Sequence, residues 1–219
     1  MVFIVKILHL LFWTGWFIIA TMIGRPKQYN HETVVENALD FFWSRGFAGS
    51  SLNELAGVVD LSKSSFYSIF KNKDDLFRQA LDLYMDRMKV EINYLSSLDD
   101  PYKAFRHLFE CTLINAPKDV IEKGCFLANS ALEQYALDDS SKELILNCFD
   151  NMKIVISKLI ARFSKSKHPD PKAIDSLANL YISQLTGLRA LGRAGFATSD
   201  LVLAIDSFLE IFIKKLKTV

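Results

Sequence analysis

The spacing of apolar residues constrains the fold of this chain more than any other feature of its sequence. The five prolines (Pro26, Pro101, Pro117, Pro169 and Pro171) all fall where the pattern is interrupted, and glycine is scarce, with nine residues in 219. In the segments between these breaks, apolar residues recur at intervals of three and four, as on one face of a helix. No segment alternates as a half-buried strand does, and no internal repeat is present. The sequence therefore predicts an all-α fold.

Capping residues and a glycine place the boundaries of the predicted helices. Asn30 is suited to cap a first helix, and Gly46 is suited to follow its end, because glycine adopts positive φ at no steric cost. Ser51 and Glu54 form a capping box at the start of a short helix, and Ser62 is suited to cap a second one. Longer helices are expected from about residue 73 to 88 and near 102–115, 125–136, 140–165, 171–193 and 199–217.

Composition bounds the class of protein. Hydrophobic residues make up 50% and charged residues 23% of the chain, which fits a globular protein and excludes wholesale disorder. The formal net charge is +1, so a nucleic-acid site has to be local. The three cysteines, Cys111, Cys125 and Cys148, are an odd set without a C-x-x-C pair, which disfavours a disulfide framework and a four-thiolate zinc site. A reducing cytoplasm is therefore expected.

Two short predicted helices joined by a tight turn match the pattern of a helix-turn-helix. The second begins with Lys63, Ser64 and Ser65, which are small or polar, as a close approach to base edges in the major groove requires. Residues 61–73 include three lysines and no acid, although residues 22–88 hold eight basic and nine acidic residues. Positive charge is thus concentrated where a phosphate backbone would pass. Spacing alone leaves equally open a helical hairpin with serine caps and a solvated lysine face.

Further local patterns extend on both sides of these two helices. They are Gly24-Arg25-Pro26, the stretch 38–42, Gly46-Phe47, the stretch 51–56, and the stretch 61–76 with the spacing Ser-x-x-Ser-x-Tyr-x-x-Phe-x-x-Lys-x-x-Leu. Over about residues 24–88 the chain thereby resembles the N-terminal domain of the TetR/AcrR-type family of transcriptional regulators. The resemblance implies a three-helix DNA-binding head, a linking fourth helix, and a larger helical body that binds small molecules and dimerises.

The resemblance also implies which residues contact DNA. Lys63, Ser64 and Ser65 would form the recognition surface, and Tyr67 would bind a phosphate. The full set of predicted DNA-binding residues is Arg25, Lys27, Ser51, Lys63, Ser64, Ser65, Tyr67, Lys71 and Lys73, of which Lys73 would also bind a phosphate. The chain departs from the family pattern at Ile69, where His or Tyr is frequent, and at Ser64, where Gly is frequent. Both departures bear on sequence preference more than on DNA binding.

The body offers one candidate for effector binding or sensing. The stretch 124–133 resembles a segment of one branch of these regulators, and Cys125 follows Lys123 and Gly124 at an expected helix start. A nearby cation and the helix dipole favour a thiolate there, so Cys125 is a candidate sensor of electrophiles or oxidants. The alternative is a small apolar packing residue, the more common role of an unpaired cysteine.

Motifs of other protein classes are missing from the sequence. H-E-x-x-H, G-x-S-x-G, G-x-G-x-x-G and C-x-x-C do not occur. Gly187 and Gly192 have the spacing of a phosphate loop but lack its Lys-Ser/Thr and a preceding strand, so close helix packing is the expected role. The four histidines, His9, His31, His107 and His168, lack metal-ligand spacing. We therefore expect neither an enzyme, nor a cofactor, nor a metal site.

Residues 1–22 differ in composition from the rest of the chain. The run 7–23 has no charged residue, but a helix over it would be about 25 Å long, shorter than the ~30 Å hydrocarbon core of a bilayer. One interpretation is a membrane-tethered regulator. The favoured one is a start assigned too early, with Met22 opening the working protein, because Arg25 then lies in a basic arm able to reach the minor groove. Either way, residues 1–21 are expected to make few contacts with the helical core.

These features together predict the organisation and function of the chain. We expect a hydrophobic extension over 1–22, a DNA-binding domain over 24–88 with its motif at about 51–70, and an effector-binding and dimerisation domain over 89–219. The expected function is a cytoplasmic transcription repressor. It would bind a palindromic operator as a homodimer through its last two helices, and a small-molecule effector would release it by re-spacing the recognition helices, which meet successive major grooves about 34–36 Å apart. The alternatives are a helical small-molecule carrier and a cofactor-free enzyme, both without DNA affinity.

Overall fold

The computed structural model describes residues 29–219. The predicted DNA contacts of Arg25 and Lys27, and both interpretations of residues 1–22, lie outside the described residues. The chain divides into Met1–Thr33 and Val34–Val219, and the packing described below is that within the second unit. None of the helices in the described part of the chain is long and apolar enough to cross a bilayer.

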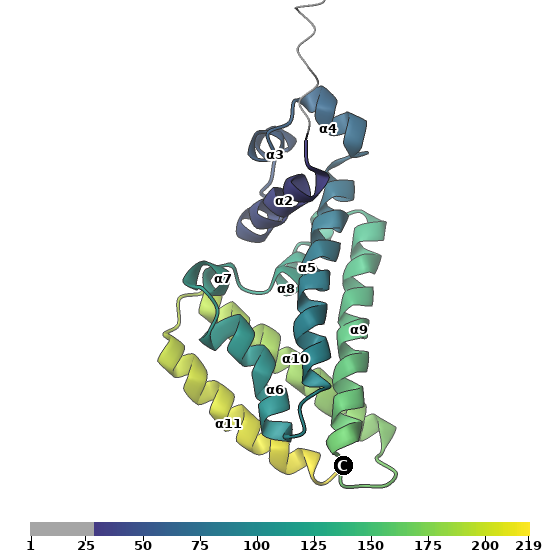
Figure 1. The fold of residues 1–219 in the computed structure, drawn as a ribbon, viewed down its shortest axis with the longest axis vertical. Coiled ribbons are helices and arrows are strands. Elements are labelled where there is room, and N and C mark those ends of the chain that lie inside the picture. The colour runs from purple at the N-terminus through teal and green to yellow at the C-terminus, as the bar shows by residue number, and fades with distance from the viewer. Residues whose placement is uncertain (1–28) are drawn as a thin grey trace, which may run out of the picture. The chain divides into compact units, whose positions relative to one another are not determined.

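Every regular element in residues 29–219 is helical, which confirms the predicted all-α fold (Figure 1). The elements are α2 (His31–Arg45), α3 (Leu52–Val58), α4 (Lys63–Ile69), α5 (Lys73–Leu95), α6 (Pro101–Phe109), the π-helical turn η1 (Glu110–Ile114), α7 (Lys118–Lys123), α8 (Phe126–Leu132), the 3-10 turn η2 (Gln134–Ala136), α9 (Asp139–Phe163), α10 (Pro171–Arg193) and α11 (Thr198–Leu216). We call α2, α3 and α4 the head, and α6 to α11 the body; α5 leads from one to the other.

The predicted caps of the head helices are present. The Ser51 hydroxyl accepts a hydrogen bond from the Glu54 amide (3.2 Å), and the Glu54 carboxylate accepts one from the Ser51 amide (3.1 Å), which completes the capping box. The hydrogen bonds from Ser51 hold the pKa of Glu54 below its ordinary value. Ser62 caps α4 by accepting from the Ser65 amide (3.1 Å), and Gly46 follows α2 with a φ of +81°. Local sequence therefore sets these boundaries.

Two of the expected body helices are interrupted. The helix expected over 102–115 is α6 followed by η1, where the Asn115 amide bonds to the Glu110 carbonyl at 2.8 Å, one residue further back than in an α-helix. The helix expected over 125–136 ends at Leu132 and continues as the 3-10 turn η2. The sequence also did not predict α7, which begins directly after Pro117. Proline suits this position because its fixed φ is compatible with entry into a helix.

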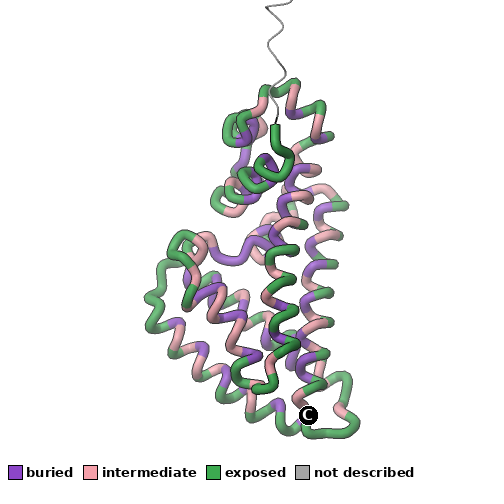
Figure 2. Tube along the Cα trace, in the orientation of Figure 1, coloured by how far each residue is buried: buried purple, intermediate pink, exposed green. Residues whose placement is uncertain are grey.

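The core runs from the head into the body along α5. Where α5 meets the head, its Phe77 packs against the rings of Phe42 and Phe47, edge to face with Phe42 at 5.5 Å. In the body, α5 packs against α6, α8 and α9, while α10 packs against α9 and α11. Buried positions recur along one side of each long helix (Figure 2). The Tyr181 hydroxyl at the centre donates to the Phe105 carbonyl (2.8 Å), so its one polar group is satisfied.

Candidate DNA interface and interior polar cluster

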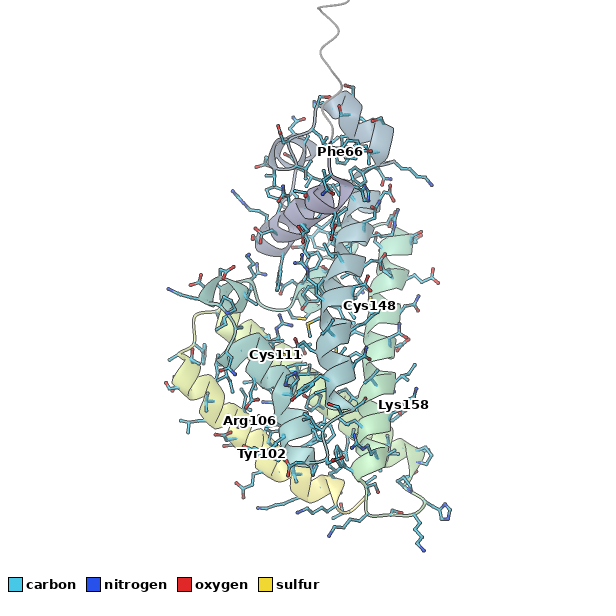
Figure 3. All side chains as sticks on the ribbon, in the orientation of Figure 1. Phe66, Tyr102, Arg106, Cys111, Cys148 and Lys158 are labelled. Atoms are coloured by element: carbon cyan, nitrogen blue, oxygen red, sulfur yellow. The ribbon has the colours of Figure 1, made fainter. Side chains whose placement is uncertain are left out.

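The turn between α3 and α4 sets the direction of the second helix. Asp60 has a φ of 54°, in the left-handed region that Asp tolerates better than most residues. The Leu61 amide then bonds back to the Ala56 carbonyl (2.9 Å), which closes the turn. On α4, Phe66 is fully buried in the head, where Figure 3 labels it, and anchors the inner side of the helix. The opposite side is thereby left open to solvent.

That open side of α4 carries the predicted recognition residues. Lys63, Ser64 and Tyr67 are exposed and Ser65 is half-buried. The Ser62 hydroxyl lies 3.0 Å from the Ser64 hydroxyl and 2.8 Å from that of Ser65, so the start of the helix is a compact group of hydroxyls. A polar, unobstructed helix start of this kind is what entry into a major groove requires. The individual DNA contacts of these residues stay predictions.

Two other predicted DNA-binding residues, Lys71 and Ser51, differ in whether their side chains already have a partner within the protein. Lys71 is exposed, and its side chain is free to approach a phosphate. Ser51 is also exposed, but its hydroxyl donates to the Glu54 carboxylate at 2.6 Å. A phosphate would have to displace Glu54 to accept that proton. Lys71 is therefore the better candidate on geometry.

Lys73 has an internal role that the sequence did not predict. Its Nζ atom donates to the carbonyls of Phe47 and Ser50, each at 2.9 Å, and lies 3.8 Å from the centre of the Phe47 ring. Burial lowers the pKa of Lys73. The ammonium thus fastens the loop between α2 and α3 to the start of α5. Two of its three N–H donors are taken, so at most one remains for a phosphate.

A buried polar cluster occupies the interior behind the head. Arg189 of α10 is 3% exposed; its Nη1 donates to the Tyr84 hydroxyl (2.9 Å) and its Nη2 to the Gly124 carbonyl (2.6 Å). Within the described part of the chain, its Nε has no hydrogen-bond partner, and the titratable groups that act on it are Tyr84 and cysteines rather than carboxylates. Burial raises the pKa of Tyr84, which stays a neutral phenol. We call Tyr84, Gly124, Cys125 and Arg189 the interior cluster.

The sequence singled out Cys125 as a candidate for effector binding or sensing, which stays a prediction, and did not single out Arg189. The Cys125 thiol caps α8, accepting from the Ala128 amide at 3.5 Å, and lies 3.7 Å from the Tyr84 hydroxyl oxygen. The sequence does contain an indication that Arg189 is buried. It lies on the same face of α10 as Leu185, Leu188 and Gly192, and all four residues are buried. A charge on such an apolar face indicates a buried charge, which proteins rarely keep without a functional or structural reason.

The interior cluster contacts the head through Trp43 of α2. The Gly124 carbonyl, which accepts from Arg189, also accepts from Trp43 Nε1 of α2 at 3.0 Å. The Trp43 ring packs edge to face on the Tyr84 ring at 5.1 Å. A second contact joins the Ala48 amide to the Glu133 carboxylate (3.0 Å). The interior cluster and α2 are therefore in direct contact.

Cys125 is expected to react slowly in the folded protein. It is 5% exposed and its sulfur is engaged by Ala128 and Tyr84, so a reagent has limited access to it. Native alkylation at pH 7, followed by mass mapping, should label Cys125 no faster than Cys148, whose pKa burial raises to about 11. Labelling of Cys125 well ahead of Cys148 would instead support the sensor hypothesis.

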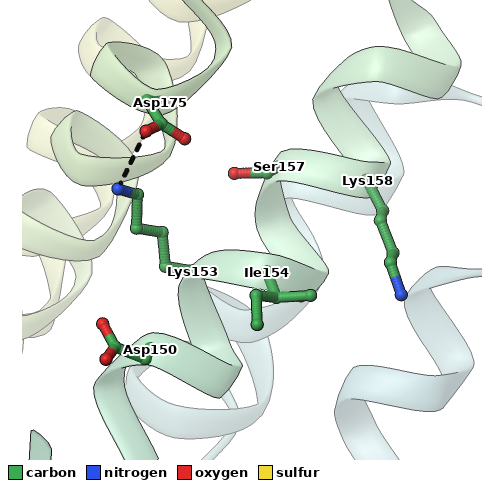
Figure 4. A pocket seen from close by; sticks show the side chains of 6 residues that line it. All are labelled: Asp150, Lys153, Ile154, Ser157, Lys158 and Asp175. Carbon is green, nitrogen blue, oxygen red and sulfur yellow. Dashed lines mark hydrogen bonds and ion pairs between the residues drawn. The ribbon is translucent and has the colours of Figure 1, made fainter. Parts of the chain in front are cut away.

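A hollow of about 490 Å³ lies on α9 and α10 (Figure 4). It is lined by Asp150, Lys153, Ile154, Ser157, Lys158 and Asp175. Lys153 and Asp175 form an ion pair across it at 3.1 Å, which ties α9 to α10. Asp150 and Lys158 add one more charge of each sign, so the lining has balanced charges and one aliphatic side chain, Ile154.

Comparisons with known proteins agree with this arrangement. Residues 34–80 match the family model described as bacterial regulatory proteins, tetR family. The repressor ComR of Escherichia coli is 30% identical over 116 residues, which are 49% of this chain and 52% of ComR. The uncharacterized regulator YezE of Bacillus subtilis is 29% identical over 53% of this chain and 60% of its own length. The chain thus spans little more than half the length of these curated relatives.

Solved structures share the fold over most of the chain. A cysteine variant of the TetR family regulator CifR, in complex with 26-base-pair operator DNA, superposes with a TM-score of 0.74 at 21% identity, covering 85% of this chain and 98% of CifR. A TetR family regulator from Cytophaga hutchinsonii gives a TM-score of 0.71 at 20% identity, covering 86% and 94%. Residues 34–80 thus match the tetR-family model in sequence, and the chain shares its fold with solved TetR family structures.

Proposed function

We propose that this protein is a DNA-binding transcriptional regulator, acting as a repressor, and not an enzyme. The observation that carries the proposal is α4, whose hydroxyl- and lysine-bearing start is exposed while Phe66 anchors the helix from behind. This helix lies in the segment that matches the family model. Serine caps on a solvated helix would also suit a carrier or an enzyme, so it is the family match of this segment that favours a DNA-binding regulator.

The proposed regulator works as a homodimer through α10 and α11. These two helices pack against each other and leave apolar side chains exposed, namely Leu180, Leu191, Leu203 and Ile211. Gly187 lies between the exposed Leu180 and Leu191 on α10. It has open space where a side chain would stand, which allows a second helix to approach closely. Gly192, in contrast, packs within the chain against Leu113 and Ile121. A second copy related by a two-fold axis would cover the exposed face and place two heads on one operator.

The interior cluster is the proposed effector site. Burying the Arg189 guanidinium without a carboxylate partner is unfavourable, and its free Nε–H is a donor available to a ligand. An effector that accepts this bond would compete with the existing contacts of Arg189. Since the Gly124 carbonyl is shared between Arg189 and Trp43, such competition would shift α2 and with it the head. The effector would thereby shift the population from an arrangement of the head that binds DNA to one that does not, and the protein would be released from DNA.

Selection of bound DNA tests the function directly. The full chain is incubated with a fragment library of its own genome at low salt, and retained fragments are sequenced. A regulator should enrich inverted repeats whose half-sites lie one helical turn, or a multiple of it, apart. Recovery of fragments without any enriched sequence would contradict the proposal and favour a carrier or an enzyme. Because non-specific binding depends on salt, the selection is repeated at two salt concentrations.

Lys71 and Tyr67 should contribute to DNA affinity without affecting stability. Lys71→Ala is expected to weaken binding to all sequences and to lower the salt slope by about one, because one phosphate contact is lost. Tyr67→Phe should weaken binding through loss of its hydroxyl. Lys167→Ala removes another exposed lysine, between α9 and α10, and serves as the control. Equal salt slopes for wild type, Lys71→Ala and the control would show that Lys71 does not contact phosphate.

A further inference from the structure

Three side chains with metal-binding atoms meet in the body, outside the interior cluster. They are Glu91 of α5, His107 of α6 and Cys111 of η1, and their ligand atoms lie within 4.8 Å of one another. The Glu91 carboxylate is 2.7 Å from His107 Nε2. The Cys111 thiol donates a weak hydrogen bond to the Leu108 carbonyl at 3.5 Å. All three residues are half-buried, so an ion could enter without unfolding the body.

The fold brings these three residues together in two ways. His107 and Cys111 are four residues apart on the continuous path of α6 and η1, so they face the same side; Figure 3 labels Cys111, which lies just beyond the end of α6. The π-helical turn at Glu110–Ile114 carries Cys111; such turns are frequent at functional sites. Glu91 is supplied by α5, which packs against α6. The Tyr94 ring lies 4.7 Å from the His107 ring and restricts its orientation.

We propose that Glu91, His107 and Cys111 bind a single divalent cation of borderline softness, for which Zn²⁺ is the expected ion. One imidazole nitrogen, one thiolate sulfur and one carboxylate oxygen form a donor set that zinc uses, whereas Mg²⁺ and Ca²⁺ select oxygen ligands. Binding displaces the thiol proton of Cys111 into solvent, and the thiolate and carboxylate together balance the charge of the ion. With three protein ligands, a fourth position stays open to water or to a small anion.

The ion would tie α5 to α6 and η1. Helix α5 begins at Lys73, shortly after α4 ends at Ile69, so an ion bound to its C-terminal part would restrain the helix that carries the head. If the chain is the regulator proposed above, zinc would then bias the arrangement of the head, as an effector or as a structural ion on which the effector response depends. This regulatory role rests on the proposed function, but metal binding itself does not.

Cobalt and zinc titrations without DNA test the site. Reduced, chelator-treated full chain is titrated with Co²⁺, which reports a thiolate ligand by an intense near-ultraviolet charge-transfer band and four-coordination by visible absorption. We expect one Co²⁺ per chain with both features, and displacement of the ion by Zn²⁺. Competition with a chromophoric chelator then gives the zinc affinity. Absence of binding, or binding without the thiolate band, overturns the proposal.

Matched variants assign the ligands. Cys111→Ser should abolish the charge-transfer band, and His107→Gln and Glu91→Gln should each lower zinc affinity at least about tenfold. Cys148→Ser and His168→Gln remove a thiol and an imidazole elsewhere in the chain. They should change neither the charge-transfer band nor the zinc affinity. The helicity of each variant is compared with that of wild type by circular dichroism. If Cys111→Ser does not fold, the zinc affinity of Glu91→Gln still tests whether this site binds the ion. Persistence of the band in folded Cys111→Ser would place the metal elsewhere. Operator affinity with and without Zn²⁺ is measured separately, so a failure to bind DNA leaves the metal result intact.

Discussion

Leu203→Glu combined with Ile211→Glu is expected to convert the proposed dimer into a monomer and to lower operator affinity by at least about 100-fold. The two side chains are 66% and 68% exposed on α11, one of the helices of the proposed interface. Four glutamates brought together across a two-fold axis would be desolvated and would repel one another, which is unfavourable. A monomer holds one half-site and loses the avidity of two linked heads, which multiplies affinity by about 10²–10⁴.

Sedimentation and operator binding measure the two parts of this effect separately. Both substituted positions are already solvent-exposed in the single chain, so its helicity and unfolding temperature should stay close to wild type. Leu146→Glu, at a 57% exposed position of α9, is the control and should remain dimeric with unchanged affinity. A double variant that stays dimeric would show that another face forms the interface. A monomer with full operator affinity would instead refute recognition by a dimer.

The head could be predicted from sequence because its boundaries are set locally. Ser51, Glu54 and Ser62 cap their helices with bonds that span three residues, and Gly46 ends α2 through its own backbone freedom. The exposed side of α4 follows equally from local periodicity, since burial of Phe66 fixes which residues point outward. These features need only the near neighbours of each residue.

The polar contacts of the interior could not be predicted in the same way. Arg189 meets Tyr84 from 105 positions away, and Trp43 meets Gly124 from 81. The metal-binding group likewise needs Glu91 from a different helix, and the His107 and Cys111 spacing alone offers only two ligands. Periodicity indicates which side of a helix is buried but not which helix covers it. Long-range pairings of this kind therefore require the packed structure.

The role of Lys73 that the structure indicates differs from the role that the sequence predicts. Its place in the motif predicts a contact with a DNA phosphate. If Lys73 made that contact, Lys73→Ala would lower the salt dependence of DNA binding. In the structure its ammonium bonds to the Phe47 and Ser50 carbonyls, and Ser50 is only 3% exposed. Loss of the ammonium would leave the buried Ser50 carbonyl without that donor. The first effect of a substitution is therefore expected on stability rather than on electrostatics.

Lys73→Met is expected to lower the free energy of unfolding by about 2–3 kcal/mol, because two hydrogen bonds from a charged donor and a cation–π contact are lost while the apolar stem is kept. Chemical denaturation without DNA measures this loss, with Lys71→Ala as a matched control that should leave stability unchanged. Operator affinity of Lys73→Met should fall through the poorer order of the loop between α2 and α3, with a salt slope equal to that of wild type. The opposite pair of results, wild-type stability with a slope lower by about one, would show that Lys73 acts on the phosphate backbone instead.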